Sequence, residues 1–122
     1  MVNSLEISVQ AVPASANLAR AAVHSTYADS LPAVALQDLK AIVTELVTNS
    51  CRYGPGDPIR VRIGARGQAV LEGEVDDHGR TVFAMEEIRN EGGLGLHIVD
   101  ALASEWEVDP AGGSVRFVLP AG

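Results

Sequence analysis

The segment from Val34 to Cys51 places the strongest constraint on how this chain can fold. Its inward-facing positions recur at intervals of three and four residues: Leu36, Leu39, Val43, Leu46, Val47 and Ser50. This spacing is typical of a helix with one buried face. The helix is predicted to stop at "YGPGDP", which holds two glycines and two prolines. Because one helix cannot bury its own apolar stripe, the other segments have to supply a second layer.

Four short segments alternate apolar and polar residues, as half-buried strands do. They are residues 5–9 (LEISV), 59–63 (IRVRI), 69–75 (AVLEGEV) and 114–120 (SVRFVLP). The second and third are joined by the turn "ARGQ" and form a predicted hairpin. Two more helices are expected: one from Ala16 to Ala28, capped by Ser15, and one from Leu94 to about Glu107.

The predicted order of elements is β-α-α-β-β-loop-α-β. Helices and strands do not alternate regularly, so we expect an α/β (α+β) two-layer sandwich with a mixed, mostly antiparallel sheet and helices on one face. The 122 residues fit a single domain, 1–122. Residues 79–92 show no period and are predicted to be a loop, with one helical turn around Met85–Ile88.

Charge and composition exclude several classes of function. The net charge is −7, and the basic residues are Lys40 and eight dispersed arginines, so no basic stripe is available to follow a nucleic-acid backbone. The sequence has no apolar run long enough for a membrane span and no signal peptide, and we expect a cytoplasmic protein. Cys51 is the only cysteine, which excludes an internal disulfide.

Two polar residues within the helix predicted over residues 34–51 could take part in chemistry. Glu45 and Asn49 are four residues apart and therefore lie on one side of that helix. An amide oxygen is a suitable ligand for Mg²⁺ bound together with nucleotide phosphates. A carboxylate one turn earlier could accept the proton of an attacking hydroxyl. In isolation, the pair is more commonly an exposed acid and a polar residue near a helix end.

Two glycine clusters follow further along the chain. Asp77 ends a predicted strand and Gly79 follows, so the carboxylate could accept a hydrogen bond from the exocyclic amino group of adenine. Gly92, Gly93 and Gly95 open a predicted helix, where unpaired N–H groups favour phosphate. The alternatives are an ordinary turn and a flexible hinge. A Walker loop is excluded because no Gly-Lys-Ser/Thr occurs.

Taken together, these segments resemble the boxes of the GHKL ATPases, named for gyrase, heat-shock chaperone, histidine kinase and the mismatch-repair ATPase. "ELVTNSCRYG" is similar to the N box, "VDDHGR" to the first glycine box and "GGLGLHIVDALASEW" to the second. Within the superfamily the chain most resembles the single-domain anti-sigma-factor serine/threonine kinases. The resemblance implies the Bergerat ATP-binding fold, a left-handed-crossover sandwich with ATP between helices and sheet.

The resemblance also implies roles for individual residues. Glu45 would be the catalytic base, Asn49 the Mg²⁺ ligand and Asp77 the residue that binds adenine. The nucleotide-binding residues it implies are Asn49, Asp77, Gly79, Gly92, Gly93, Leu94, Gly95 and Leu96. The implied function is an ATP-dependent protein-serine kinase that regulates transcription: it holds a sigma factor inactive and phosphorylates an antagonist protein. Apolar surface on the first helix or first strand could support a homodimer.

Two positions depart from the family pattern. Thr81 stands where the first glycine box usually has a second glycine, and Glu91 precedes "GGLGL", where a basic side chain would better neutralise a γ-phosphate. The alternative hypothesis is therefore a non-catalytic regulatory module with the same fold that binds ATP weakly or not at all. A detached ATP-binding half of a histidine kinase is disfavoured, because His24 falls within the first predicted helix.

Overall fold

Five strands form one antiparallel sheet in the computed structural model, which describes residues 3–52, 56–78, 96–109 and 113–121. The order across the sheet is β1-β2-β3-β5-β4. The strands are β1 (Leu5–Val9), β2 (Ile59–Ala65), β3 (Val70–Asp76), β4 (Glu105–Asp109) and β5 (Ser114–Pro120). All four pairings between these strands are antiparallel. The predicted mostly antiparallel sheet is confirmed.

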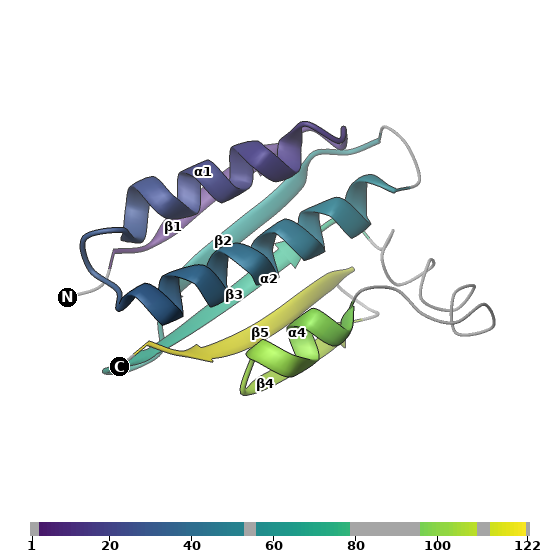
Figure 1. Cartoon of the computed structure of the whole chain (residues 1–122). Coiled ribbons are helices and arrows are strands. Elements are labelled where there is room, and N and C mark those ends of the chain that lie inside the picture. The colour runs from purple at the N-terminus through teal and green to yellow at the C-terminus, as the bar shows by residue number, and fades with distance from the viewer. Residues whose placement is uncertain (1–2, 53–55, 79–95, 110–112, 122) are drawn as a thin grey trace.

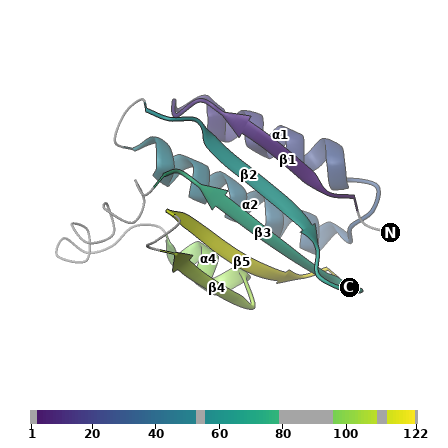
Figure 2. The same cartoon turned by 180° about the vertical axis from the view of Figure 1, so that it is seen from behind.

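The helices described by the structure lie on one face of this sheet (Figure 1). They are α1 (Ser15–Tyr27), α2 (Ala33–Cys51) and α4 (Leu96–Leu102). Seen from behind, the strands lie in front of the helices, and no labelled helix covers that face of the sheet (Figure 2). The two-layer arrangement predicted from the order of elements is therefore confirmed.

The core lies between the two layers, and α2 is its central element. All the inward positions predicted on this helix are buried: Leu36, Leu39, Val43, Leu46, Val47 and Ser50. The strands contribute their alternate residues to the same core, among them Val61, Val75 and Phe117. The period of 3.6 in the helix and the period of 2 in the strands thus bring the two apolar faces together.

The first helix begins one residue earlier than predicted, and its capping differs. Ser15 is the first residue of α1 rather than its cap, and no side-chain hydrogen bond caps the helix at Ala14. The Ser15 N–H instead donates to the Val12 carbonyl at 2.9 Å, so a backbone turn already satisfies it. At the other end of α1, burial raises the pKa of Tyr27 to about 12, and its hydroxyl donates to the Ile63 carbonyl at 3.4 Å.

The helix predicted from Leu94 to Glu107 is wrong at its C-terminal end. The helix α4 ends at Leu102, and β4 begins three residues later. Trp106 is four residues after Leu102, which fits a helical face, but Trp106 and Val108 also alternate with acids as a strand requires. Pairing with β5 favours the strand over the helix, because Trp106 is the cross-strand partner of Phe117. The helical turn predicted around Met85–Ile88 lies outside the described residues.

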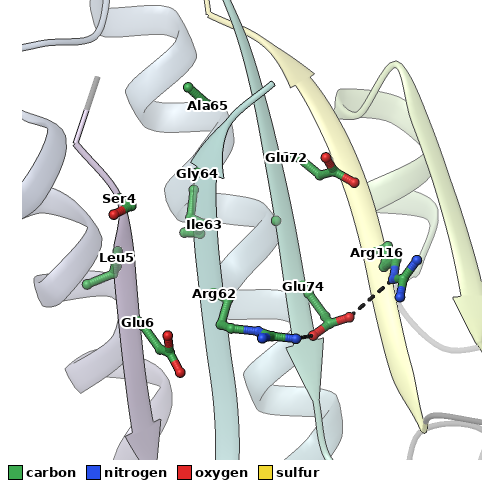
Figure 3. Close-up of a pocket in the computed structure, with 11 residues that line it drawn as sticks. Ser4, Leu5, Glu6, Arg62, Ile63, Gly64, Ala65, Glu72, Glu74 and Arg116 are labelled. Carbon is green, nitrogen blue, oxygen red and sulfur yellow. Dashed lines mark hydrogen bonds and ion pairs between the residues drawn. The ribbon is translucent and has the colours of Figure 1, made fainter. Parts of the chain in front are cut away.

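A row of alternating charges crosses the face of the sheet that carries no described helix. From β1 to β4 the row reads Glu6, Arg62, Glu74, Arg116 and Glu107, each directly opposite the next. Figure 3 shows Glu74 between the two arginines, with Arg62 Nη2 at 2.6 Å and Arg116 Nε at 3.2 Å from its oxygens. Around this row the surface is hollowed by a depression of about 510 Å³.

Glu74 is expected to give this row a pH-dependent contribution to stability. Burial by itself would raise the pKa of Glu74, but hydrogen bonds from Arg62 and Arg116 outweigh it and the pKa is lowered. The stabilisation is therefore present above the unfolded-state value of about 4.3 and is lost as pH falls through the lower folded-state pKa. We expect Glu74→Gln to lower the free energy of unfolding by about 1 kcal/mol at pH 7.

Urea denaturation at pH 7 and at pH 3 measures this effect. The difference between Glu74→Gln and the parent should shrink at pH 3, because the unfolded chain, whose carboxylate has an ordinary pKa of about 4.3, takes up a proton there and the stabilisation declines. Glu72→Gln is the matched control: Glu72 is exposed on the same strand, two residues away. An equal loss of stability for Glu74→Gln at both pH values would contradict the assignment.

Candidate functional site

Three buried polar residues gather where α2 and β3 end. Asn49 and Ser50 are in the last turn of α2, and Asp77 directly follows β3. Their exposed fractions are 4%, 1% and 2%. Buried polar side chains require polar partners, and each such residue in a core needs an explanation. We call Asn49, Ser50 and Asp77 the α2–β3 cluster.

Ser50 joins the helix to the strand end. Its hydroxyl donates to Asp77 Oδ2 at 2.7 Å, and the Leu46 carbonyl oxygen lies 2.9 Å from the same Oγ. The sequence pattern places Ser50 only on the buried stripe of the helix and does not assign it to the site. The signal is a hydroxyl at an otherwise apolar position, since a buried hydroxyl requires a hydrogen-bond partner.

Asp77 is held from a second side by the sheet. Its backbone N–H donates to the Gly113 carbonyl at 3.3 Å, next to the start of β5. The chain then turns at His78, which has a φ of 59° and whose N–H donates to Asp76 Oδ1 at 3.0 Å. The Asp77 carboxylate is therefore oriented by α2 through Ser50, and its backbone is held by the carbonyl of Gly113, directly before β5.

Asn49 is the residue of the cluster that suits a metal ion bound with phosphates. Its Nδ2 is buried and has no hydrogen-bond partner among the described residues. The two ends of an amide are interchangeable by a 180° rotation, so the oxygen can occupy that position. An oxygen ligand of this kind fits Mg²⁺, which usually takes one or two protein groups plus phosphate oxygens. The described residues hold no group of three His, Cys, Asp or Glu able to bind a metal.

Glu45 lies one helical turn before Asn49 but in a different environment. Its side chain is half-buried and lines a depression of about 260 Å³, together with Arg20 of α1 and Ile98 of α4. Asn49, by contrast, is in the interior. A carboxylate in such a depression is accessible to a hydroxyl group brought by a partner molecule.

The other residues predicted for nucleotide binding fall at or beyond the edge of the described structure. Leu96 is the first residue of α4 and is buried, with 8% of its surface exposed. Five predicted residues lie outside the described residues: Gly79, Gly92, Gly93, Leu94 and Gly95. Thr81 and Glu91 lie there as well. Phosphate binding by the second glycine cluster therefore stays a prediction.

The sequence led us to expect no membrane-spanning helix. Among the helices that the structure describes, none is both long enough and apolar enough to cross a bilayer.

A family model described as a histidine kinase-like ATPase domain matches residues 9–119. Among solved structures, the RsbU and RsbW domains of Rv1364c from Mycobacterium tuberculosis align with a TM-score of 0.74 at 21% sequence identity. The alignment covers 98% of this chain and 32% of that chain, so this chain spans about a third of its length. No curated protein matches.

Proposed function

Because the chain belongs to the histidine kinase-like ATPase family, we propose that it binds ATP beside the α2–β3 cluster and transfers the γ-phosphate to a serine of a partner protein. The family membership confirms the GHKL resemblance found in three sequence boxes. The ligand, the acceptor and the residue roles go beyond what family membership shows and rest on the chain's own contacts.

The hydrogen bond between Ser50 and Asp77 carries the proposal. It fixes a nearly fully buried carboxylate at the junction of α2, β3 and β5. A site that holds an acceptor in a fixed orientation selects a ligand that brings a matching donor, and adenine brings an exocyclic amino group. Asp77 therefore accounts for the choice of adenine, and Ser50 keeps its carboxylate oriented.

The remaining chemistry is divided between Asn49 and Glu45. Mg²⁺, when bound, would supply positive charge to the phosphates, with the Asn49 amide oxygen as its protein ligand. Glu45 would accept the proton of the serine hydroxyl as the oxygen attacks the γ-phosphorus and the bond to the ADP leaving group breaks. Phosphoryl transfer depends mainly on such positioning and on charge stabilisation.

The proposed biological role is that of an anti-sigma regulatory factor. Its partners would be a sigma factor and the antagonist protein that carries the phosphorylated serine. Support comes from the sequence resemblance to single-domain anti-sigma-factor kinases, and the fold shared with a chain that contains an RsbW domain is compatible with it.

Stabilisation by Mg-ATP tests the nucleotide part of the proposal. A ligand present at 100 times its dissociation constant stabilises the folded state by about 2.7 kcal/mol, which should raise the melting temperature on the order of 10 °C. Differential scanning calorimetry with ATP and magnesium, against magnesium alone, measures the shift. An unchanged melting temperature at millimolar ATP would refute nucleotide binding.

Glu45→Gln separates phosphoryl transfer from nucleotide binding. We expect transfer of label from γ-labelled ATP to a candidate antagonist protein to fall about 10²- to 10⁴-fold. Stabilisation by ATP should be unchanged, because Glu45 accepts a proton and is not assigned to the nucleotide. Asp38→Asn is the matched control, a half-buried acid on the same helix. Transfer by Glu45→Gln at the parent rate would rule out this base.

The sequence departures at Thr81 and Glu91 favour one alternative. A regulatory module with this fold could bind its partners, with or without ATP, and transfer no phosphate. If ATP stabilises the parent chain but no candidate antagonist is labelled under conditions that saturate the nucleotide site, this alternative replaces the kinase.

A further inference from the structure

The carboxylate assigned to adenine lies just beyond the paired part of its strand. Val75 and Asp77 are both 2% exposed, so Asp77 continues the buried face of β3 towards the helices. The ladder between β2 and β3 ends one residue earlier, with the pair Arg60 and Asp76. Strand ends open more readily than the paired interior of a sheet. Asp77 therefore needs contacts other than the β2–β3 ladder to keep its position.

His78 links this strand end to β2 through its side chain. Its Nε2 lies 3.2 Å from the Pro58 carbonyl oxygen, directly before β2. A carbonyl oxygen only accepts, so Nε2 carries the proton and donates. Continued by two residues, the register of Arg60 and Asp76 places Pro58 opposite His78. Because proline has no N–H to donate to a neighbouring strand, the imidazole supplies the cross-strand bond at this position.

The backbone of His78 also indicates a residue held in place by its surroundings. Its φ of 59° lies in the left-handed region, which is uncommon for residues other than glycine. Such conformations persist where neighbouring contacts hold them, and they gather at functional sites. The bond from the His78 N–H to Asp76 stays within the same strand end, so it cannot fix that end relative to β2. The bond of the imidazole to Pro58 does so.

Three elements of the fold thus hold Asp77 and the residue after it. Ser50 of α2 donates to Asp77 Oδ2 at 2.7 Å, and the Gly113 carbonyl, directly before β5, accepts the Asp77 N–H at 3.3 Å. The imidazole of His78 supplies the third restraint, from the β2 side. A group that binds a ligand has to be held to within about 0.5 Å, and contacts behind it provide that precision.

We propose that His78 is a positioning residue for adenine recognition: its bond to Pro58 holds the end of β3 so that the Asp77 carboxylate stays in line with the adenine amino group. His78 acts through Asp77, because its own Nε2 is engaged by Pro58. The identity of the ligand rests on the proposed function, whereas the restraint on Asp77 requires no nucleotide.

His78→Asn removes this restraint and keeps the turn. Asparagine also adopts positive φ readily, but its side chain is too short to reach Pro58. Because the bond is exposed to solvent, its loss should weaken ATP binding by only about 5-fold in calorimetric titration with magnesium. His78→Gln, which carries an amide donor at a similar reach, should bind ATP like the parent. The matched control is His24→Asn, the same substitution at an exposed position of α1.

A second nucleotide distinguishes positioning of Asp77 from general loosening of the pocket. Purine ribonucleoside triphosphate has a hydrogen where adenine has its amino group, so it offers Asp77 no donor. Its affinity should be the same in the parent and in His78→Asn. In the Asp77→Ala background, His78→Asn should not weaken ATP binding further, since the two residues act as one unit. Equal weakening for both nucleotides, or additive losses in the double variant, would overturn the proposal.

Hydrogen exchange of the Asp77 amide, followed by NMR without nucleotide, separates this proposal from the proposed function. Exchange should be about 5-fold faster in His78→Asn than in the parent, and unchanged in His24→Asn. Faster exchange in a chain that ATP fails to stabilise would support the restraint on Asp77 and remove the nucleotide. ATP binding that depends on Asp77, with exchange and affinity unchanged in His78→Asn, would overturn the role of His78 and leave the proposed function standing.

Discussion

Gly73→Ala is expected to lower the free energy of unfolding by about 3 kcal/mol, the largest effect on stability predicted for this chain. Gly73 on β3 is the cross-strand partner of Phe117 on β5. A Cβ at this position would lie against the ring, with Phe117 Cε1 at 2.6 Å and Cε2 at 2.7 Å. The ring is 1% exposed and already lies where the Cβ would be placed, so either the ring or the strand has to shift.

Gly64→Ala is the control for this substitution. Gly64 is on the neighbouring strand β2, and a Cβ there would have no atom within 4 Å. Its effect should stay within about 0.5 kcal/mol of the parent, as for ordinary surface positions. Urea denaturation measures both. The double variant Gly73→Ala/Phe117→Leu should recover part of the loss if ring contact is the cause, and a near-neutral Gly73→Ala would show that the core relaxes freely.

Asp77→Ala is expected to weaken ATP binding by about 100-fold, because it removes the buried acceptor assigned to the adenine amino group. At an ATP concentration that gives the parent about 2.7 kcal/mol, the variant would gain only about 0.4 kcal/mol. The unliganded fold should tolerate the change. Once Asp77 is removed, the Ser50 hydroxyl still has the Leu46 carbonyl at 2.9 Å as an acceptor.

The control and the readout both address adenine recognition. Asp76→Ala removes a carboxylate one residue away that accepts from the His78 backbone N–H, and it should retain ATP binding. The parent should prefer ATP over GTP, since guanine presents a carbonyl where adenine has its amino group, and Asp77→Ala should lose that preference. Calorimetric titration with each nucleotide measures this. Equal ATP affinity in parent and Asp77→Ala would remove Asp77 from the nucleotide site.

Local sequence patterns were sufficient to predict a helix or strand where one face of the element is buried and the other is exposed to solvent. The strand at residues 5–9 and the strand at 114–120 have the predicted bounds, and α2 begins one residue before the prediction. Only β4 was missed. Its five residues follow a helix directly, and Trp106 fits both periods, so the pattern alone could not choose between helix and strand.

For the site, the sequence supplied residue types and the structure supplied their neighbours. Asn49 and Asp77 were selected because an amide near a helix end and an acid at a strand end suit a nucleotide. Their burial beside Ser50 could not be read from spacing, because Ser50 and Asp77 are 27 residues apart. The same holds for the depression lined by Arg20 of α1 and Lys40 of α2, which are 20 positions apart in the sequence.

The layer architecture and the family follow from the sequence alone, since hydrophobic period, turn residues and the order of three boxes are all local features. The contacts between distant residues require the tertiary structure: the Ser50–Asp77 bond, the ring of Phe117 over Gly73 and the charge row on the sheet. The physical reason is that these contacts depend on strand register and helix placement. Both are set by the burial of the whole core and by no single segment.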